Sequence, residues 1–246
     1  MTDLRKADEQ EPQIVLLDCD GVLVENTAFE RRVTKTIVSE LAELRGVSLA
    51  HAGALWSEEL SSTRRDWRWY DYSYHCERLG LRPRTTVRNA HLGAAHLLSV
   101  VPGARDTLSA LRTNGYIVGV ATDATQWVVR YKLDRLRIDI DGPIHTSDTL
   151  MSTKAKREYW LQVASRSDGV PPCLLVDNRD ENLAAAREVL ALKTVRFLRH
   201  EHVTTLSHSV APLSRQHAKG EYRSAADHRQ LRAALHEVLP RFDLTA

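Results

Sequence analysis

Short apolar runs alternate with helical patterns along most of this chain. The apolar runs occupy residues 13–17, 116–121, 172–176 and 194–198. A continuous apolar run of this length is typical of a strand that is buried on both faces, as in a parallel sheet. Each of the first three runs is followed directly by a polar residue. These residues are Asp18, Thr122 and Asp177. The alternation predicts a doubly wound α/β sheet with these three side chains at its carboxyl edge, where such sheets bind ligands.

The helical patterns that connect these runs have the length and spacing of amphipathic helices. They cover residues 104–114, 125–136, 154–165 and 180–192, and a further one follows at 224–239. Residues 199–223 are instead polar and rich in histidine, without a clear period, and we expect a loop there. No cysteine or carboxylate cluster accompanies these histidines, so we interpret them as surface residues rather than metal ligands. They are His200, His202, His208 and His217.

Residues 26–99 break the alternation, because they contain several helical periodicities and no comparable apolar run. One helix carries an apolar face that Gly46 can terminate. That face consists of Val33, Ile37, Leu41 and Leu44. Residues 52–61 and 67–79 supply two more candidate helices. The segment is therefore expected to be an inserted helical module.

Composition excludes several classes of protein. Lysine and arginine total 34 and aspartate and glutamate total 32, so the net charge of +2 argues against a nucleic-acid wrapper. The 43% of hydrophobic residues is typical of a packed globular chain. No run reaches about 18 apolar residues and the first twelve residues are polar, so we expect neither a membrane span nor a secretion signal. Three cysteines without CxxC spacing favour a cytoplasmic location.

Two carboxylates stand two residues apart where the first run ends, at Asp18 and Asp20, and Gly21 follows. One carboxylate at a strand end can attack an electrophile and bind a hard cation, and a second can protonate a leaving group and then activate water. Gly21 lets the chain turn sharply, so that both carboxyl groups can face one cavity. An ordinary turn after a strand explains the same residues, and the later segments are what favour catalysis.

Four segments, in this order, resemble the motifs of the haloacid dehalogenase (HAD) superfamily. The first is the apolar strand followed by Asp-x-Asp-Gly, the second is a strand that closes on a threonine, the third is a lysine that opens a helix, and the fourth is an acidic strand end before an alanine-rich helix. They lie at residues 14–21, 118–123, 154–160 and 174–186. Each motif alone is weak, but four in order are a strong signal.

The resemblance implies a HAD-like Rossmannoid core and phosphate-ester chemistry. It assigns Asp18 as the nucleophile that forms an aspartyl-phosphate, and Asp20 as the general acid and base. Thr122 and Lys154 would stabilise the phosphoryl group, and Asp123 is grouped with them as a substrate-binding residue.

The resemblance also implies a Mg²⁺ cofactor, held by oxygen ligands. The expected metal-binding residues are Asp18, Asp177, Asn178 and the backbone carbonyl of Asp20. The fourth motif often carries a second acid where this chain has Asn178, or a few residues later, and Glu181 is the candidate for that later acid.

The third motif lacks the prolines usual in the family, and Lys156 competes with Lys154 as its lysine. We prefer Lys154, because the sixth residue after it is Trp160, where the family pattern has an apolar residue. The alternative is that both lysines are solvated residues in the first turn of a helix.

Much more of the chain separates the first and second motifs than the second and third, which places a C1-type helical cap at residues 26–99. The core would comprise residues 13–25 and 100–246, after a disordered segment at residues 1–12. Such caps close over small substrates, so a small phosphorylated metabolite is the expected substrate.

Three functions stay open at this point. Relatives that cleave carbon–halogen bonds or phosphonates lack an acid at the position of Asp20, so a phosphatase is preferred. A phosphomutase of the same fold is the first alternative. The second is a weakly active or non-catalytic protein that binds a phosphorylated ligand or a protein partner.

Basic and aromatic residues are interleaved at residues 64–74. Such a pattern can hold nucleic acid, but the aromatic side chains fall on one helical face, which favours packing within the cap. We expect no nucleic-acid partner, and we expect Arg64 or Arg68 to reach a distal anionic group of the substrate. Arg82, Arg84 and Arg88 are interpreted as a solvated face.

Overall fold

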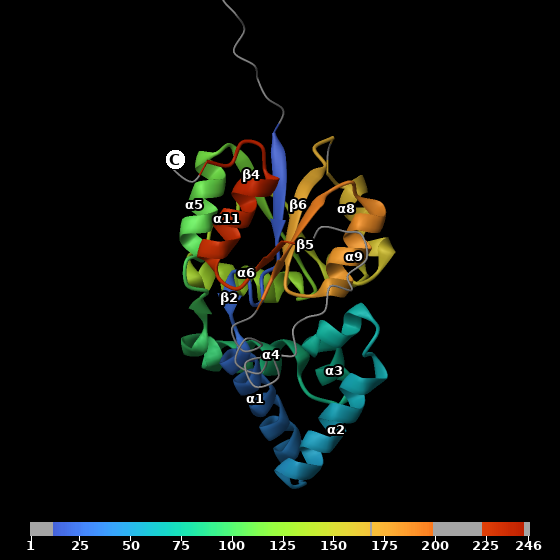
Figure 1. The fold of residues 1–246 in the computed structure, drawn as a ribbon. Helices are drawn as coiled ribbons and strands as arrows, with labels where there is room; N and C mark the ends of the chain where they lie inside the picture. Colours follow the sequence, from blue (N-terminus) through green and yellow to red (C-terminus); the bar gives the residue numbers. More distant parts are fainter. Residues whose placement is uncertain (1–11, 168, 199–222, 244–246) are drawn as a thin grey trace, which may run out of the picture.

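The computed structural model describes residues 12–167, 169–198 and 223–243, and a six-stranded sheet lies at its centre (Figure 1). The strand order is β5-β4-β1-β6-β7-β8, and every neighbouring pair is parallel. The strands are β1 (Gln13–Leu17), β4 (Tyr116–Thr122), β5 (Ile144–Thr146), β6 (Pro172–Asp177), β7 (Lys193–Phe197) and β8 (Arg223–Ala225). The predicted doubly wound α/β architecture is thereby confirmed.

Helices cover both faces of the sheet, because the side chains of each strand alternate between two separate apolar cores. Val15 and Leu17 of β1 belong to the core that contains residues of α5 (Ala104–Thr113), α6 (Gln126–Leu136) and α11 (His228–Val238). Ile14 and Leu16 belong to the other core, with residues of α8 (Arg157–Ser165) and α9 (Asp180–Val189). In Figure 1, α5 and α11 lie on one side of the sheet and α8 and α9 on the other. Burial on both faces explains the continuous apolar runs.

Residues 26–99, which we call the cap, form helices beside the carboxyl ends of the strands (Figure 1). The helical elements are α1 (Thr27–Arg45), α2 (Leu49–Ser62), η1 (Trp67–Tyr70), α3 (Tyr72–Arg78), α4 (Pro83–Ala94) and η2 (Ala95–Leu97). Two short strands, β2 (Val24–Glu25) and β3 (Ser99–Val100), pair antiparallel where the chain leaves the core and returns to it. The elements at the carboxyl edge of the sheet thus face α1, η1 and α4.

Several elements differ from the sequence expectation. The predicted helix over residues 67–79 is two elements, because the Asp71 carboxylate caps α3 by accepting from the amides of Ser73 and Tyr74 at 2.9 and 3.2 Å. The basic patch at Arg82, Arg84 and Arg88 belongs to α4, a helix that the sequence analysis missed. Its buried face is made largely of small residues, so its apolar period is weak.

The remaining differences concern two short elements, the ends of two helices and one residue of α1. Strand β5 and helix α7 (Ser147–Leu150) were not predicted, because three and four residues carry no periodic signal. Helix α8 begins at Arg157, so Lys154 precedes it, and α9 ends at Val189 rather than at residue 192. On α1 the predicted apolar face is buried except for Leu44, which is 54% exposed.

Some expectations lie outside the described residues. They are the disordered segment, of which only residue 12 is described, and the histidine-rich loop with His200, His202, His208 and His217. Among the helices of the described ranges, none combines the length and the apolar character that a membrane crossing requires.

Gly119 of β4 is packed so closely that a side chain there would meet its neighbours. A Cβ atom added there would lie 2.7 Å from the carbonyl oxygen of Pro143 and 2.8 Å from Cδ2 of Leu16. We therefore expect Gly119→Ala to lower the free energy of unfolding by about 1–3 kcal/mol, because the β4 backbone or its neighbours must shift. Urea denaturation measures this difference.

Gly93 is the matched control for Gly119. It lies within α4, and a Cβ atom added there would meet nothing within 4 Å. Gly93→Ala should leave stability unchanged or raise it by up to about 1 kcal/mol, because alanine has the higher helix propensity. Equal effects of the two substitutions would contradict the packing argument.

Candidate active site

Three polar residues meet where adjacent strands end. Asp18 follows β1, Thr122 ends β4 and Asp177 ends β6, and β1 lies between the other two strands. Each is at most 5% exposed. The parallel sheet therefore brings together residues that are far apart in the sequence, as the motifs predicted.

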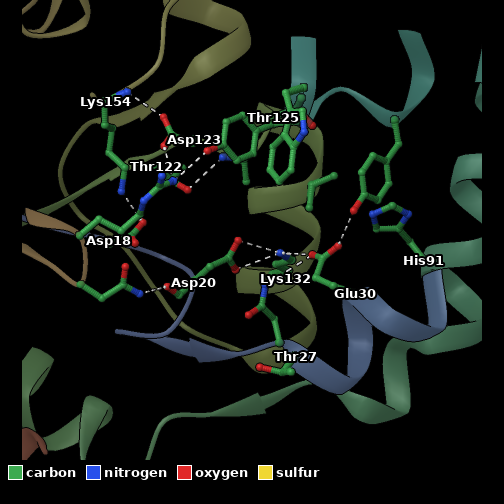
Figure 2. A pocket seen from close by; sticks show the side chains of 18 of the residues that line it. Asp18, Asp20, Thr27, Glu30, His91, Thr122, Asp123, Thr125, Lys132 and Lys154 are labelled. Carbon is green, nitrogen blue, oxygen red and sulfur yellow. Dashed lines mark hydrogen bonds and ion pairs between the residues drawn. The ribbon is translucent and has the colours of Figure 1, made fainter. Parts of the chain in front are cut away.

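Lys154 extends from the loop before α8 into this group. Its Nζ lies 2.7 Å from Oδ1 of Asp18 and donates to Oδ2 of Asp177 at 2.6 Å. Its backbone is fixed from two sides, because its carbonyl accepts from Nε1 of Trp160 at 2.7 Å and its amide donates to Oδ1 of Asp123 at 2.7 Å. Lys156 is exposed. The geometry thus places Lys154, and not Lys156, at the strand ends (Figure 2).

Two buried carboxylates share the one ammonium group of Lys154. Burial raises the pKa of Asp18 to about 7, with Asp177 and Asp20 adding to the rise and Lys154 opposing it. Burial also lowers the pKa of Lys154, but the carboxylates outweigh this and hold that pKa well above its usual value. The site therefore has more negative charge than its lysine can balance, and a cation there would be stabilised.

The oxygen atoms at these strand ends suit Mg²⁺. They are the carboxylates of Asp18 and Asp177 and the carbonyl of Asp20, beside which Asn178 lies, since its Nδ2 donates to that carbonyl at 3.0 Å. Within the described ranges, no three or more His, Cys, Asp or Glu side chains are grouped as a metal site. Mg²⁺ needs no such group, because it usually keeps several waters and binds one or two carboxylates together with substrate phosphate.

In the fourth motif, the side chain that bonds to Asp177 is the amide of Asn182 and not a second carboxyl group. Nδ2 of Asn182 donates to both oxygens of Asp177 at 3.1 Å, and the amide of Arg179 donates to Oδ1 at 2.8 Å. Glu181 is half-exposed and pairs with Arg179 at 2.6 Å. The side chain that bonds to Asp177 is thus Asn182, and Glu181 pairs with Arg179 instead. The part of Glu181 as the later acid of the motif stays a prediction.

Thr122 and Asp123 have different roles in the geometry. Oγ1 of Thr122 accepts from the amide of Ala124 at 3.2 Å, so its hydroxyl proton is free to be donated to a ligand. The carboxylate of Asp123 holds the amide of Lys154 and lies 3.9 Å from Arg179, and burial raises its pKa. Asp123 lines the cavity described below, and its contact with substrate stays a prediction.

The side chain of Asp20 turns away from the other carboxylates toward Lys132 on α6 (Figure 2). Nζ of Lys132 donates to both oxygens of Asp20, at 2.9 and 3.0 Å, and to Oε1 of Glu30 on α1 at 2.8 Å. Sequence reasoning missed this network. The available signal was that Lys132 lies beside Val129 and Leu133 on the buried stripe of α6, where a lysine needs a partner.

Core and cap together line a cavity of about 480 Å³, into which these groups project (Figure 2). The core contributes the site residues Asp18, Asp20, Thr122, Asp123, Lys132, Lys154 and Asn178. The cap contributes Asn26, Thr27, Glu30, Arg31, Trp69, Tyr70, Tyr72 and His91. The cap thus adds aromatic side chains to the lining of the cavity, beside the charged groups Glu30 and Arg31.

The structure does not bring Arg64 or Arg68 into the cavity, contrary to expectation. Arg68 pairs with Asp66 at 3.2 Å, and its guanidinium lies 4.9 Å from the ring centroid of Trp67. Oδ1 of Asp66 also accepts from the backbone amide of Arg68 at 2.9 Å, which holds Arg68 at the start of η1. The arginines that line the cavity are Arg31 and Arg179, and Arg179 also donates to the hydroxyl of Tyr70 at 3.0 Å.

The chain is similar to known proteins in its sequence pattern and in its fold. A family model for haloacid dehalogenase-like hydrolases matches residues 12–189, and no curated protein matches the chain. The HAD phosphatase from Thermococcus onnurineus is similar in structure with a TM-score of 0.68 and 18% identity, over 91% of this chain and 97% of that one.

Two further solved structures belong to enzymes of different names. A putative beta-phosphoglucomutase from Thermotoga maritima has a TM-score of 0.57 and 16% identity, over 92% of this chain and 100% of that one. The L-2-haloacid dehalogenase from Xanthobacter autotrophicus has a TM-score of 0.55 and 15% identity, over 93% and 100%. At such identities the likeness shows the fold alone, so the choice of reaction depends on the residues of the cavity.

Proposed function

We propose that this chain, which belongs to the haloacid dehalogenase-like hydrolase family, is a Mg²⁺-dependent phosphatase that acts on a small phosphorylated metabolite. One observation carries the proposal: the carboxylates of Asp18 and Asp20 line the same cavity, together with Thr122 and Lys154. This set supplies a nucleophile, an acid and base, and two donors for phosphoryl oxygens.

Asp20 is the residue that favours phosphate esters over organic halides. Displacement of a halide needs no proton on the leaving group, whereas an alcohol leaves a phosphate ester readily only when it is protonated. The family resemblance implies that carbon–halogen enzymes lack an acid at this position. Here Asp20 is present and lines the cavity, which supports the phosphatase over the dehalogenase.

The first step of the proposed reaction forms a bond between Asp18 and phosphorus. A carboxylate oxygen of Asp18 attacks the phosphorus atom, and the bond from phosphorus to the leaving oxygen breaks in line with it. Asp20, protonated, gives its proton to that oxygen, so the product leaves as a neutral alcohol. An aspartyl-phosphate and an ionised Asp20 remain.

The second step reverses the role of Asp20. Its carboxylate removes a proton from a water molecule as that water attacks phosphorus, and the bond between phosphorus and Asp18 breaks. Inorganic phosphate is released and both residues return to their initial protonation states. Lys154 and the hydroxyl of Thr122 stabilise the oxygens of the transferred group in both steps.

Mg²⁺ would be held by Asp18, Asp177 and the carbonyl of Asp20, with Asn178 beside it. When bound, it would supply positive charge next to the oxygens of the phosphoryl group. Lys154 contributes the fixed part of that charge, because it is buried and bonded on both sides. Lys154 also limits the repulsion between Asp18 and Asp177 before substrate binds.

Phosphate release tests the proposal directly. The purified protein is incubated with p-nitrophenyl phosphate and with a panel of sugar, nucleotide and three-carbon phosphates, in Mg²⁺ and in excess chelator. We expect phosphate release that requires Mg²⁺ and that differs among the metabolites, because the cap walls select the leaving group.

The alternatives give different results in the same assay. Transfer of the phosphoryl group to an added sugar phosphate instead of to water would assign a phosphomutase. Halide release from a 2-haloacid, without phosphate release, would refute the proposal in favour of a dehalogenase. Thermal stabilisation by a phosphorylated compound that is not turned over would indicate a binding protein.

A further inference from the structure

The ammonium group of Lys132 lies between a carboxylate of the core and a carboxylate of the cap. It is fully buried, and its bonds to the two oxygens of Asp20 and to Glu30 are 2.8–3.0 Å long. These bonds direct the ammonium of Lys132 to Asp20 and Glu30. Although Lys132 lines the cavity, it is paired with carboxylates other than Asp18 and Asp177, so its role differs from that of Lys154.

The contact of Lys132 with Asp20 constrains the reacting carboxylate. Both oxygens of Asp20 accept from the same nitrogen, which defines the direction of the carboxyl group. The Asp20 side chain is 24% exposed and borders the cavity. A carboxylate in that position has two rotatable bonds and, without such a partner, would sample several rotamers.

The cap holds Lys132 from its other side. Glu30 on α1 accepts from Lys132, from the hydroxyl of Tyr72 at 3.3 Å and from Nδ2 of Asn26 at 3.4 Å. The ring centroid of Phe29 lies 5.5 Å from Nζ of Lys132, within the range of a cation–π contact. The ammonium is thus located by groups of α1 as well as by Asp20.

We propose that Lys132 is the positioning residue for the acid and base Asp20, and that Glu30 holds Lys132 in that role from the cap. This rests on the proposed function, in which Asp20 must lie within hydrogen-bond reach of the leaving oxygen. Lys132 transfers no proton and touches no substrate. It acts by fixing the direction from which Asp20 donates, and general acid catalysis of this kind contributes roughly 10²–10⁴-fold.

The dependence of the first step on the leaving group tests this role. In a rapid-quench experiment, formation of the aspartyl-phosphate is measured with glycerol 3-phosphate, whose alkoxide needs a proton, and with p-nitrophenyl phosphate, whose phenolate leaves without one. For Lys132→Met we expect a loss of roughly 100-fold with the alkyl ester and less than about threefold with the aryl ester. Equal losses with both esters, or no loss with either, would overturn the proposal.

Two further variants separate positioning from a charge defect. Lys132→Met leaves Glu30 without its cation, so the double variant E30Q/K132M removes both charges. If the double variant still loses rate with the alkyl ester and not with the aryl ester, positioning is supported. If its rate with the alkyl ester returns to the wild-type value, the loss in Lys132→Met came from the unpaired charge of Glu30, and the proposal fails. Lys35→Met removes an exposed lysine of α1 and should leave both rates unchanged.

If Lys132→Met does not fold, the same rapid-quench test is made with Glu30→Gln. Its amide oxygen still accepts from Lys132, but the charge that holds the ammonium is gone. We expect a smaller loss than for Lys132→Met with the same preference for the alkyl ester. An unchanged alkyl rate would refute the part assigned to Glu30.

A crystal structure of Lys132→Met, or of E30Q/K132M, tests the inference without turnover. The Asp20 carboxylate should be displaced from its wild-type direction, and an unmoved Asp20 would overturn the inference. The proposed function fails separately, if the wild-type protein releases phosphate from no compound of the panel described above.

Discussion

Replacing Asp18 by asparagine (Asp18→Asn) should lower kcat/KM for phosphate release by roughly 10⁴-fold or more, as the loss of a covalent nucleophile does in other enzymes. Asparagine has nearly the same size and can accept the bond from Lys154, but its neutral amide lacks the carboxylate oxygen that attacks phosphorus to form the acyl phosphate. Steady-state phosphate release with the best substrate of the panel gives the ratio. Wild-type activity in the variant would refute the assignment of Asp18.

The fold of Asp18→Asn is checked by its stability as a function of pH. In wild type, burial raises the pKa of Asp18 from 3.8 to about 7, so ionising this group costs stability as the pH rises from about 4 to about 7. Asparagine does not ionise. In chelator, the free energy of unfolding of the variant minus that of wild type should therefore increase from about pH 4 to about pH 7. Above pH 7 the variant should be at least as stable as wild type.

Replacing Lys154 by methionine (Lys154→Met) should impair both catalysis and stability. The buried carboxylates of Asp18 and Asp177 lose the ammonium that lies 2.7 and 2.6 Å from them. Removing one partner of a buried ionic group costs about 3–5 kcal/mol, and loss of a donor to the transition state costs roughly 10²–10³ in rate. Urea denaturation in chelator and kcat/KM measure the two effects.

Two comparisons make this prediction specific. Mg²⁺ should restore part of the stability of Lys154→Met, because a divalent cation compensates the same two carboxylates. Lys156→Met removes an exposed lysine two residues away and should change stability by less than about 0.5 kcal/mol. A larger rate loss for Lys156→Met than for Lys154→Met would reverse the choice between these lysines.

The sheet was predictable because the signal of a buried parallel strand is local. The runs at β1, β4 and β6 are largely apolar, the run at β7 is interrupted by Arg196, and each element was expected within a few residues of its observed bounds. Elements without such a signal were missed. Strand β5 is too short, and the buried face of α4 is too poor in large apolar residues to show a period.

The cap side chains could not be assigned from the sequence. Arg64 and Arg68 were expected near the substrate, and the cavity is instead lined by Arg31 and Arg179. The reason lies before α3: Arg64 lies in the turn that follows α2, and Arg68 pairs with Asp66 at 3.2 Å. A continuous helical pattern drawn over residues 67–79 shows neither the turn nor this pairing.

By itself, the sequence determined the α/β sheet, the family and the strand ends that carry Asp18, Asp20, Thr122 and Asp177, because apolar runs and motifs are read from neighbouring residues. Only the tertiary structure decided which cations face those carboxylates. Lys154 rather than Lys156 reaches Asp18, and Lys132 joins Asp20 to Glu30 across the cavity. Those pairings join residues of separate elements, and they depend on how loops and helices pack against the sheet, which no local pattern encodes.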